Sequence, residues 1–194
     1  MSAAATAFAI GSPAPDFDGL FGVDGSRYSL SSFAGSELLA LIFSGNGCPT
    51  ARAAEDGLTE LQAAYAGPRF QLLMINANNQ YLSPPDTYAE MVAKAAEKGL
   101  NFPYVKDEDG SVARRYGASR TPHAFLLDQE RRLRYRGRIA DSRDPAKVTR
   151  LDVRCAVEDL LASREVEVSE TEPAGARSSG EHGRLNRDYS VPVE

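Results

Sequence analysis

One cysteine, Cys48, stands where an apolar segment gives way to a helix that opens on proline. Residues 38–44 form an apolar run of strand length, and glycines flank the following turn at positions 45 and 47. A thiol at the N-terminus of a helix lies at the positive end of the helix dipole, where the thiolate is favoured over the thiol. Because the thiolate is the nucleophile in disulfide exchange, the sequence predicts a reactive cysteine at position 48.

Two neighbours of Cys48 in the sequence are expected to support a thiolate. Pro49 falls in the first turn of the helix, where proline is well tolerated. Arg52 lies four residues after Cys48 on the same helical face, so its charge would add to the stabilisation. The thiol pKa is then expected to fall well below its free value of about 8.5. The alternative is a buried and inert cysteine, because free cysteines are among the most buried residues.

A group of amides follows the next apolar strand, which we expect over residues 70–75. Asn76, Asn78 and Asn79 would lie where the carboxyl ends of two neighbouring strands meet, and α/β sheets bind ligands at such crevices. Asn76 and Asn78 are therefore candidates for hydrogen bonds to a peptide or small substrate. The open alternative is that these residues serve the chemistry of a turn.

Two further groups are better explained by packing. His123 could take a proton from a thiol, but strand alternation points it away from the side that Pro122 faces, which favours a core or edge histidine. Cys155 continues an apolar stripe with Val148 and Leu151, which is typical of core packing.

Arginines at positions 132, 134, 136 and 138 alternate with other residues along one strand. They indicate a solvated face that also blocks edge-to-edge pairing of the strand. An anionic partner is the alternative.

The elements that position these residues follow the order strand, helix, strand, helix, strand pair, helix. We expect strands over residues 38–44, 70–75, 102–105 (an edge strand), 123–127 and 133–139, and helices that begin near Pro49, Ser83, Asp109 and Asp144. The first half is typical of a parallel βαβ unit and the second half ends in an antiparallel hairpin, which predicts a mixed sheet with helices on both faces.

The composition bounds the class of protein. A chain of 194 residues with 42% hydrophobic residues suits one domain, and a net charge of −5 argues against general nucleic-acid affinity. The chain has no apolar run near the roughly 18 residues of a membrane span, and its first residues make a poor signal peptide. Two cysteines form neither a disulfide framework nor a metal set, so a reducing cytoplasm is expected.

We expect a flexible segment over residues 1–10, a domain over 11–163 and a poorly ordered tail over 164–194.

Five motifs carry a family resemblance. They are Gly-Ser-Pro-Ala-Pro-Asp-Phe at 11–17, Cys-Pro at 48–49, Gly-Leu-Asn-Phe-Pro-Tyr at 99–104, Tyr-Gly-Ala-Ser-Arg-Thr-Pro-His at 116–123 and Leu-Arg-Tyr-Arg-Gly-Arg-Ile at 133–139. In this order they resemble the redoxin (AhpC/TSA) branch of the thioredoxin fold, and more narrowly the peroxiredoxin-like 1 group of thioredoxin-domain proteins. The resemblance implies a three-layer α/β/α sandwich with a mixed central sheet and an N-terminal extension.

The resemblance also implies a function. It implies a thiol-dependent oxidoreductase that needs no cofactor or metal and uses Cys48 as nucleophile on a thiol, disulfide or peroxide substrate. The pair Thr121-Pro122 would form the cis-proline loop, in which the backbone before the proline docks the partner of the catalytic sulfur. By base rate alone, an X-Pro bond is expected to be trans.

The chain departs from its relatives at the residues that complete the chemistry. Typical peroxiredoxins carry Pro-x-x-x-Thr/Ser-x-x-Cys, whereas this chain has Leu41 and Gly45 at the proline and hydroxyl positions. The second cysteine of a Cys-x-x-Cys motif is replaced by Ala51, and alanine also replaces a tail cysteine that relatives carry soon after a Glu-Thr-x-Pro stretch. An external thiol, glutathione or a thioredoxin-like protein, would therefore resolve the mixed disulfide.

Two other functions stay open at this stage. A redoxin scaffold that has lost turnover would bind a protein partner through the surface around Cys48 and Pro122. A one-cysteine peroxide scavenger is disfavoured by the missing hydroxyl residue. The oligomeric state is left open.

Overall fold

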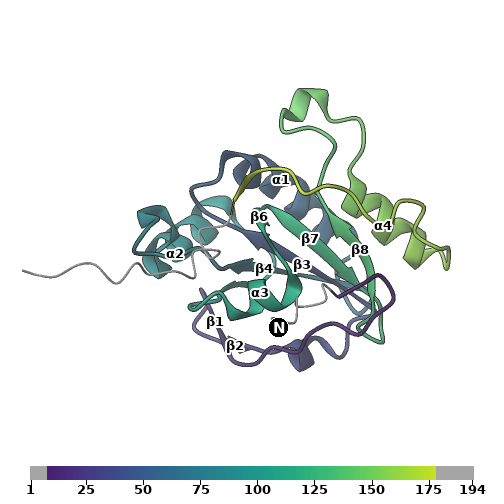
Figure 1. Cartoon of the computed structure of the whole chain (residues 1–194), viewed down its shortest axis with the longest axis horizontal. Helices are drawn as coiled ribbons and strands as arrows, with labels where there is room; N and C mark the ends of the chain where they lie inside the picture. The colour runs from purple at the N-terminus through teal and green to yellow at the C-terminus, as the bar shows by residue number, and fades with distance from the viewer. Residues whose placement is uncertain (1–7, 178–194) are drawn as a thin grey trace, which may run out of the picture.

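The structure, a computed structural model, describes residues 8–177. A seven-stranded mixed sheet in the order β2-β1-β5-β4-β3-β7-β8 forms its centre (Figure 1). The strands of this sheet are β1 (Leu20–Gly22), β2 (Arg27–Tyr28), β3 (Leu38–Ser44), β4 (Phe70–Asn76), β5 (Tyr104–Lys106), β7 (His123–Leu127) and β8 (Leu133–Gly137). The helices are α1 (Pro49–Ala64), α2 (Tyr88–Lys98), α3 (Ser111–Tyr116) and α4 (Asp152–Leu161), with 3₁₀ turns η1 (Leu30–Phe33), η2 (Pro84–Asp86) and η3 (Pro145–Lys147).

Strand β3 is the central strand that leads into the candidate site. It pairs in parallel with β4 and antiparallel with β7, and all of its residues are buried. A strand covered on both faces needs apolar side chains in both directions, which is why its sequence is continuously apolar. Its bounds match those that the sequence predicts.

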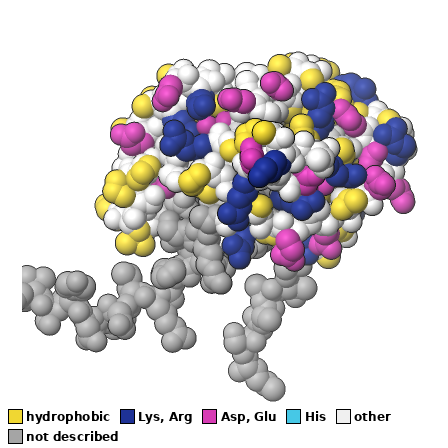
Figure 2. Space-filling model, turned by 90° about the horizontal axis from the view of Figure 1, so that it is seen from above, with side chains coloured by type: hydrophobic (Ala, Val, Ile, Leu, Met, Phe, Trp, Pro, Cys, Tyr) yellow, Lys and Arg dark blue, Asp and Glu magenta, His cyan; other side chains and the backbone are white. Residues whose placement is uncertain are grey.

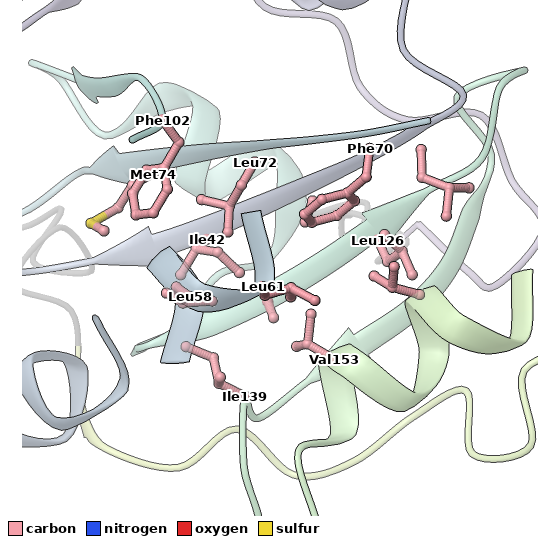
Figure 3. Packing of buried hydrophobic residues seen from close by; sticks show 14 of the residues in the cluster. Ile42, Leu58, Leu61, Phe70, Leu72, Met74, Phe102, Leu126, Ile139 and Val153 are labelled. Carbon is pink, nitrogen blue, oxygen red and sulfur yellow. The ribbon is translucent and has the colours of Figure 1, made fainter. Parts of the chain in front are cut away.

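The two faces of the sheet carry separate hydrophobic clusters. Leu58 of α1 and Val153 of α4 cover one face, where they pack with Ile42 and Leu72 from the sheet (Figure 3). Met91 of α2 belongs to the same cluster. The other face is covered by α3, η1 and the segment before β1. Helices on both faces of a mixed sheet make the three-layer α/β arrangement that the sequence predicts.

The segment before β1 contributes to the core. The ring of Phe8 lies edge-on to Tyr116 at 5.2 Å between centroids and stacks on Phe125 at 6.0 Å. Residues 8–10, which we expected to be flexible, therefore pack on the sheet. The rest of that expectation, residues 1–7, lies outside the described residues.

Three expected elements differ from the structure. The helix expected to open near Ser83 is there only the 3₁₀ turn η2, and α2 begins after it at Tyr88, with Thr87 as its N-cap. Strand β5 lies between β1 and β4 and is an interior strand, because the hairpin of β1 and β2 pairs onto its outer side. The last helix is interrupted: η3 ends at Lys147, and Val148 adopts an extended backbone before α4 begins at Asp152. The loop between β8 and α4 therefore stands out from the body of the fold (Figure 1).

Residues 164–177 form what we call the C-terminal strap. They leave α4, run beside β8 and end in the short strand β9 (Ala176–Arg177), which pairs with β6 (Arg120–Thr121). Our expectation of a poorly ordered tail from residue 164 was wrong for this segment, because backbone hydrogen bonds and polar side-chain contacts, such as that of Arg136 with Glu170, anchor a segment with few apolar residues. Residues 178–194 lie outside the described part. Within residues 8–177, the helices are too short or too polar to cross a membrane.

Candidate active site at the start of helix α1

Cys48 is the N-cap residue of α1, with an extended backbone, and Pro49 is the first helical residue. The sharp turn between β3 and α1 is closed by a hydrogen bond from the Cys48 amide to the carbonyl of Gly45 at 3.2 Å. The side chain of Cys48 is 6% exposed. The strand, the glycine turn and the proline-started helix thus place the thiol where the sequence predicts it.

The sulfur of Cys48 contacts the backbone of the loop before β7. Its thiol donates a hydrogen bond to the carbonyl oxygen of Thr121 at 3.0 Å, and the Thr121-Pro122 peptide bond is cis. Only the protonated sulfur can donate this bond. A thiolate at the same position would face a carbonyl oxygen, while the N–H groups of the first turn of α1 would attract it. The two influences oppose each other, so ionisation favours movement of the sulfur away from Thr121.

The backbone predicted to dock a partner is paired with the chain itself. Thr121 in β6 pairs with Ala176 in β9, and the Arg120 guanidinium donates to the carbonyl of Gly175 at 3.0 Å. Gly175 is buried and lines the hollow beside Cys48. The C-terminal strap therefore occupies the place beside Thr121 that the resemblance assigns to a substrate.

The middle of the strap, residues 169–171, is held by β8 and the residue that follows it. The Arg136 amide donates to the carbonyl of Ser169 at 3.0 Å, and the Thr171 amide donates to the carbonyl of Arg136 at 3.1 Å. The hydroxyl of Thr171 accepts a hydrogen bond from the Arg138 amide at 3.0 Å and lies 2.8 Å from the hydroxyl of Tyr135. These contacts aim the following residues at the Cys48 site.

The arginine stripe on β8 is paired with carboxylates of this chain. Arg134 pairs with Asp128 and Arg138 pairs with Asp152, each at 2.7 Å, and Arg136 pairs with Glu170 of the strap. Figure 2 shows side chains of both charges intermingled over one face of the molecule. The pairing supports the interpretation of a solvated, internally balanced face over that of a site for an anionic partner.

Asn76 and Asn78 lie in a buried polar cluster. Their amide groups donate to the carboxylate of Asp86 in η2 at 2.8 and 3.1 Å. The same carboxylate accepts from the Asn46 amide at 2.6 Å and from the hydroxyl of Ser83. The structure thus gives both asparagines an internal role, which ties the turn before Cys48 to η2. A direct role of Asn76 and Asn78 in substrate docking stays a prediction, because the contacts described above are all within the protein.

Lys106 and Tyr104 complete this cluster from β5. The ammonium of Lys106 donates to the carbonyls of Asn78 at 2.6 Å and Asp86 at 3.0 Å, and burial lowers its pKa although Asp86 opposes that shift. The Tyr104 hydroxyl donates to the side-chain carbonyl of Asn46 at 2.7 Å, and burial raises the Tyr104 pKa above its usual range. The turn before Cys48 is therefore fixed by a buried network of charged and neutral groups.

Two arginines lie near the start of α1, on different sides. Arg52 lines a hollow between α1 and α2, together with Asn46 and Glu90. The hollow that Cys48 lines is instead shared with Arg143, from the loop between β8 and α4. Support of a thiolate by Arg52 therefore stays a prediction, and Arg143 is the guanidinium that shares a hollow with the sulfur.

His123 is a core residue, as the strand pattern predicts. Its ring packs at 4.4 Å from the ring of Phe125 on the face of the sheet opposite α1. Burial lowers the His123 pKa to about 4, with a smaller contribution from the charge of Arg136, and its Nδ1 makes no hydrogen bond within residues 8–177. A neutral imidazole on that face does not act as a base for Cys48. Cys155 is half-buried on α4, so its predicted place in the core is only partly right.

Four residues that build the site are not predicted from the sequence: Asp86, Lys106, Arg143 and Gly175. Asp86 follows Ser83 and two prolines, a pattern that predicts a helix start and gives no sign of a buried carboxylate. Lys106 stands at the end of an apolar strand. In an interior strand such a lysine is buried and needs polar partners, so its position could have indicated a polar cluster. Arg143 and Gly175 reach the site only through the long loop before α4 and the strap, and nothing local in the sequence indicates that.

The fold and the position of the thiol define a thioredoxin-like α/β protein with one cysteine at the start of its first long helix. Residues 9–152 match the Redoxin family. The chain therefore belongs to the Redoxin family, and this membership supports thiol oxidoreductase chemistry at the level of the family. The narrower peroxiredoxin-like 1 group stays a prediction.

Solved structures agree with this assignment. A hypothetical protein from Sinorhizobium meliloti 1021 is 32% identical, with a TM-score of 0.82 over 89% of this chain and 94% of its own. An uncharacterized conserved protein from Geobacillus kaustophilus is 29% identical, with a TM-score of 0.82 over 89% and 93%. A thiol:disulfide interchange protein of the thioredoxin family from Chlorobium tepidum TLS is 20% identical, with a TM-score of 0.56 over 66% and 86%, which shows likeness of fold alone. Among curated proteins, none matches the sequence.

Proposed function

We propose that this protein is a thiol-dependent oxidoreductase with Cys48 as its single nucleophile. The observation that carries the proposal is the position of the sulfur, at the N-terminus of α1 and 3.0 Å from the carbonyl oxygen of Thr121. The N–H groups of the first helical turn favour a thiolate at this place. The adjacent hollow, lined by Thr50 and Arg143, gives a small molecule access to it.

In the proposed reaction the Cys48 thiolate attacks one sulfur of a disulfide substrate. A new S–S bond forms to Cys48, the substrate S–S bond breaks, and the second sulfur leaves as a thiolate with the electron pair. An external thiolate then attacks the substrate sulfur of the mixed disulfide, forms a new S–S bond to it and releases Cys48 as a thiolate. A second external thiol breaks that bond, which frees the substrate thiol and leaves the reductant as a disulfide. We propose glutathione or a thioredoxin-like protein, in the cytoplasm, as this reductant. Its thiols are oxidised as the substrate disulfide is reduced.

The need for an external thiol follows from the residues around Cys48. Position 51, one helical turn onward, holds a buried alanine, so the Cys-x-x-Cys pair cannot form. Cys155 lies on α4, a different helix, and is not among the residues that line the hollow. The hydrogen bond to Thr121 must also break before attack, because a thiolate has no proton to donate.

Alkylation of Cys48 across a pH series tests the proposal. We expect iodoacetamide to modify Cys48 with a midpoint below about 8.5, the value of a free thiol. Replacement of Cys48 by Ser should abolish disulfide reductase activity, whereas Cys155→Ser should keep it. A midpoint at or above the free value, or activity that survives Cys48→Ser, contradicts the proposal.

A second candidate is a partner-binding module that has lost turnover. The buried alanine at position 51, where a resolving cysteine would lie, favours the loss of turnover. The strap that pairs with Thr121 would have to be displaced before a partner reached that backbone. Capture of a partner that is unchanged in Cys48→Ala protein would support binding alone. Capture that requires Cys48, and that a reductant reverses, would support exchange chemistry.

Peroxide reduction is the least supported candidate. Leu41 and Gly45 replace the proline and the hydroxyl residue that align peroxide in typical peroxiredoxins. Stopped-flow oxidation by hydrogen peroxide should therefore proceed at a rate near that of an ordinary free thiol. A much faster rate would make peroxide reduction the leading candidate.

A further inference from the structure

An apolar pocket of about 400 Å³ lies along α1, directly beside the Cys48 site. Ala53 and Leu58 of α1 form one wall, and Pro122 and Ile139 contribute from the ends of the neighbouring strands. The loop between β8 and α4 closes the pocket with Val148 and Leu151. A pocket of this size and lining suits a small ligand with an apolar body.

The pocket and the Cys48 hollow are neighbours that share two lining residues. Thr50 and Arg143 line both, and the strap contributes Ala174 to the pocket and Gly175 to the hollow. A molecule whose apolar body lies in the pocket can therefore extend a reactive group to the sulfur.

The two ends of the pocket differ in charge. At the Cys48 end, the exposed guanidinium of Arg143 makes no hydrogen bond or ion pair with residues 8–177. Arg154, farther away, is already paired with Glu158 at 2.8 Å. The carboxylate of Asp56, which pairs with Lys98 at 3.8 Å, and that of Glu60, which has no ion pair within residues 8–177, lie later on α1, about 12 and 18 Å of helical rise from Cys48. An anionic group on a ligand is thus attracted to the Cys48 end and repelled from the other end.

We propose that this pocket selects the substrate of Cys48: a low-molecular-weight disulfide with an apolar, ring-sized body and a carboxylate next to its sulfur. The proposal rests on the proposed oxidoreductase function and narrows it to a substrate class. Arg143 binds the carboxylate, α1 and the loop before α4 hold the body, and the disulfide lies over Cys48. The thiolate attacks the nearer sulfur, and the second half leaves as a thiolate with the bonding electron pair.

Two model disulfides separate this proposal from simple thiol reactivity. The aromatic 2,2′-dithiodibenzoate, in which each carboxylate is ortho to its sulfur, fits the proposed class, whereas cystamine is small and carries positive charge. The rate at which each disulfide reacts with the full chain is measured in Cys155→Ser protein, so that Cys48 is the one thiol. This rate is divided by the rate at which the same disulfide reacts with N-acetylcysteine at the same pH, which corrects for its intrinsic reactivity. We expect the aromatic disulfide to react with saturation and with a normalised preference over cystamine of about tenfold, which corresponds to roughly 1.4 kcal/mol.

Variants locate the preference in the pocket. Ala53→Phe, which fills the pocket from an exposed helical position, should lower the ratio of the two rates by about tenfold and abolish saturation. Arg143→Glu should lower the ratio further by reversing the charge that faces the carboxylate. Ala63→Phe, elsewhere on α1, and Lys147→Glu, on the same loop as Arg143, are the matched controls and should keep the ratio of the parent.

The outcomes are distinguishable. A ratio near one, a linear dependence on concentration, or a preference that both pocket variants retain would overturn the pocket assignment and leave the oxidoreductase proposal standing. Failure of both disulfides to react faster than they react with N-acetylcysteine, or reaction that persists in Cys48→Ser protein, would remove the proposed function itself.

Discussion

Gly175 of the C-terminal strap lies directly against Thr121, the residue whose carbonyl accepts the hydrogen bond from Cys48. An added Cβ at position 175 would come within 1.9 Å of that carbonyl oxygen, and Gly175 has a φ of +125°, which side chains rarely adopt. The strap and the sulfur thus both lie against the carbonyl group of Thr121. Any change that moves the strap is expected to change the surroundings of Cys48.

Gly175→Ala should release the end of the strap. The new methyl group cannot fit, and the backbone strain alone costs roughly 1–3 kcal/mol. We expect iodoacetamide to modify Cys48 several times faster, because Gly175 lines the hollow beside the sulfur. Gly35→Ala, at an exposed glycine with open space around it, is the control. An unchanged alkylation rate in Gly175→Ala protein would show that the strap does not limit access.

Asp86→Asn should destabilise the protein and loosen the turn before Cys48. The carboxylate of Asp86 accepts hydrogen bonds from the Asn46 amide and from the amide groups of Asn76 and Asn78. In asparagine an NH₂ group replaces one of the two carboxylate oxygens, so at least one of these N–H groups would lose its acceptor. The expected loss is about 3 kcal/mol in the free energy of unfolding. Urea denaturation measures it, with exposed Glu130→Gln as the control. A loss near that of the control would mean that this network rearranges freely.

The buried His123 should make stability depend on pH in one direction. Its pKa is about 4 in the folded protein against 6.5 when exposed, so the unfolded chain binds the extra proton between these values. Stability should therefore be complete above pH 6.5 and should fall by roughly 3 kcal/mol as the pH drops toward 4. Urea midpoints of wild-type and His123→Phe protein at several pH values test this.

The difference in stability between wild-type and His123→Phe protein reports the titration of His123 alone, because all other groups titrate in both proteins. We expect the difference to grow as the pH falls, with the variant relatively more stable in acid. A difference that is constant from pH 4.5 to 7.5 would contradict the depressed pKa.

Ala51→Cys should supply the resolving thiol that the chain lacks. Position 51 lies in the first turn of α1, on the same side of the helix start as Cys48, and residues three apart on a helix are neighbours. We expect the variant to form an intramolecular disulfide under mild oxidation, seen as a mass loss of two hydrogens and loss of both thiols. Ala53→Cys, on an exposed face of the same helix, should not form one. Retention of free thiols in oxidised Ala51→Cys protein would show that the sulfur of Cys48 points away from this turn.

Local sequence signals determined the elements that carry Cys48. The apolar run of β3, the glycines of the following turn and Pro49 each restrict the backbone on their own, so the thiol at a helix start could be placed without a structure. The same holds for His123, because the period of two along a strand assigns it to the face with Phe125. These features depend on residues close together in the chain.

Contacts between distant segments decided the surroundings of that thiol. Asn76 follows its strand as predicted, but only the arrival of η2 and β5 places its amide on Asp86 and not toward a substrate. Arg143 and Gly175 come from the loop and the strap that follow the sheet, and their approach to Cys48 depends on backbone pairing that leaves no periodic pattern in the sequence. Side-chain type and spacing therefore determined which residue can react, whereas tertiary hydrogen bonds and packing decided what lies next to it.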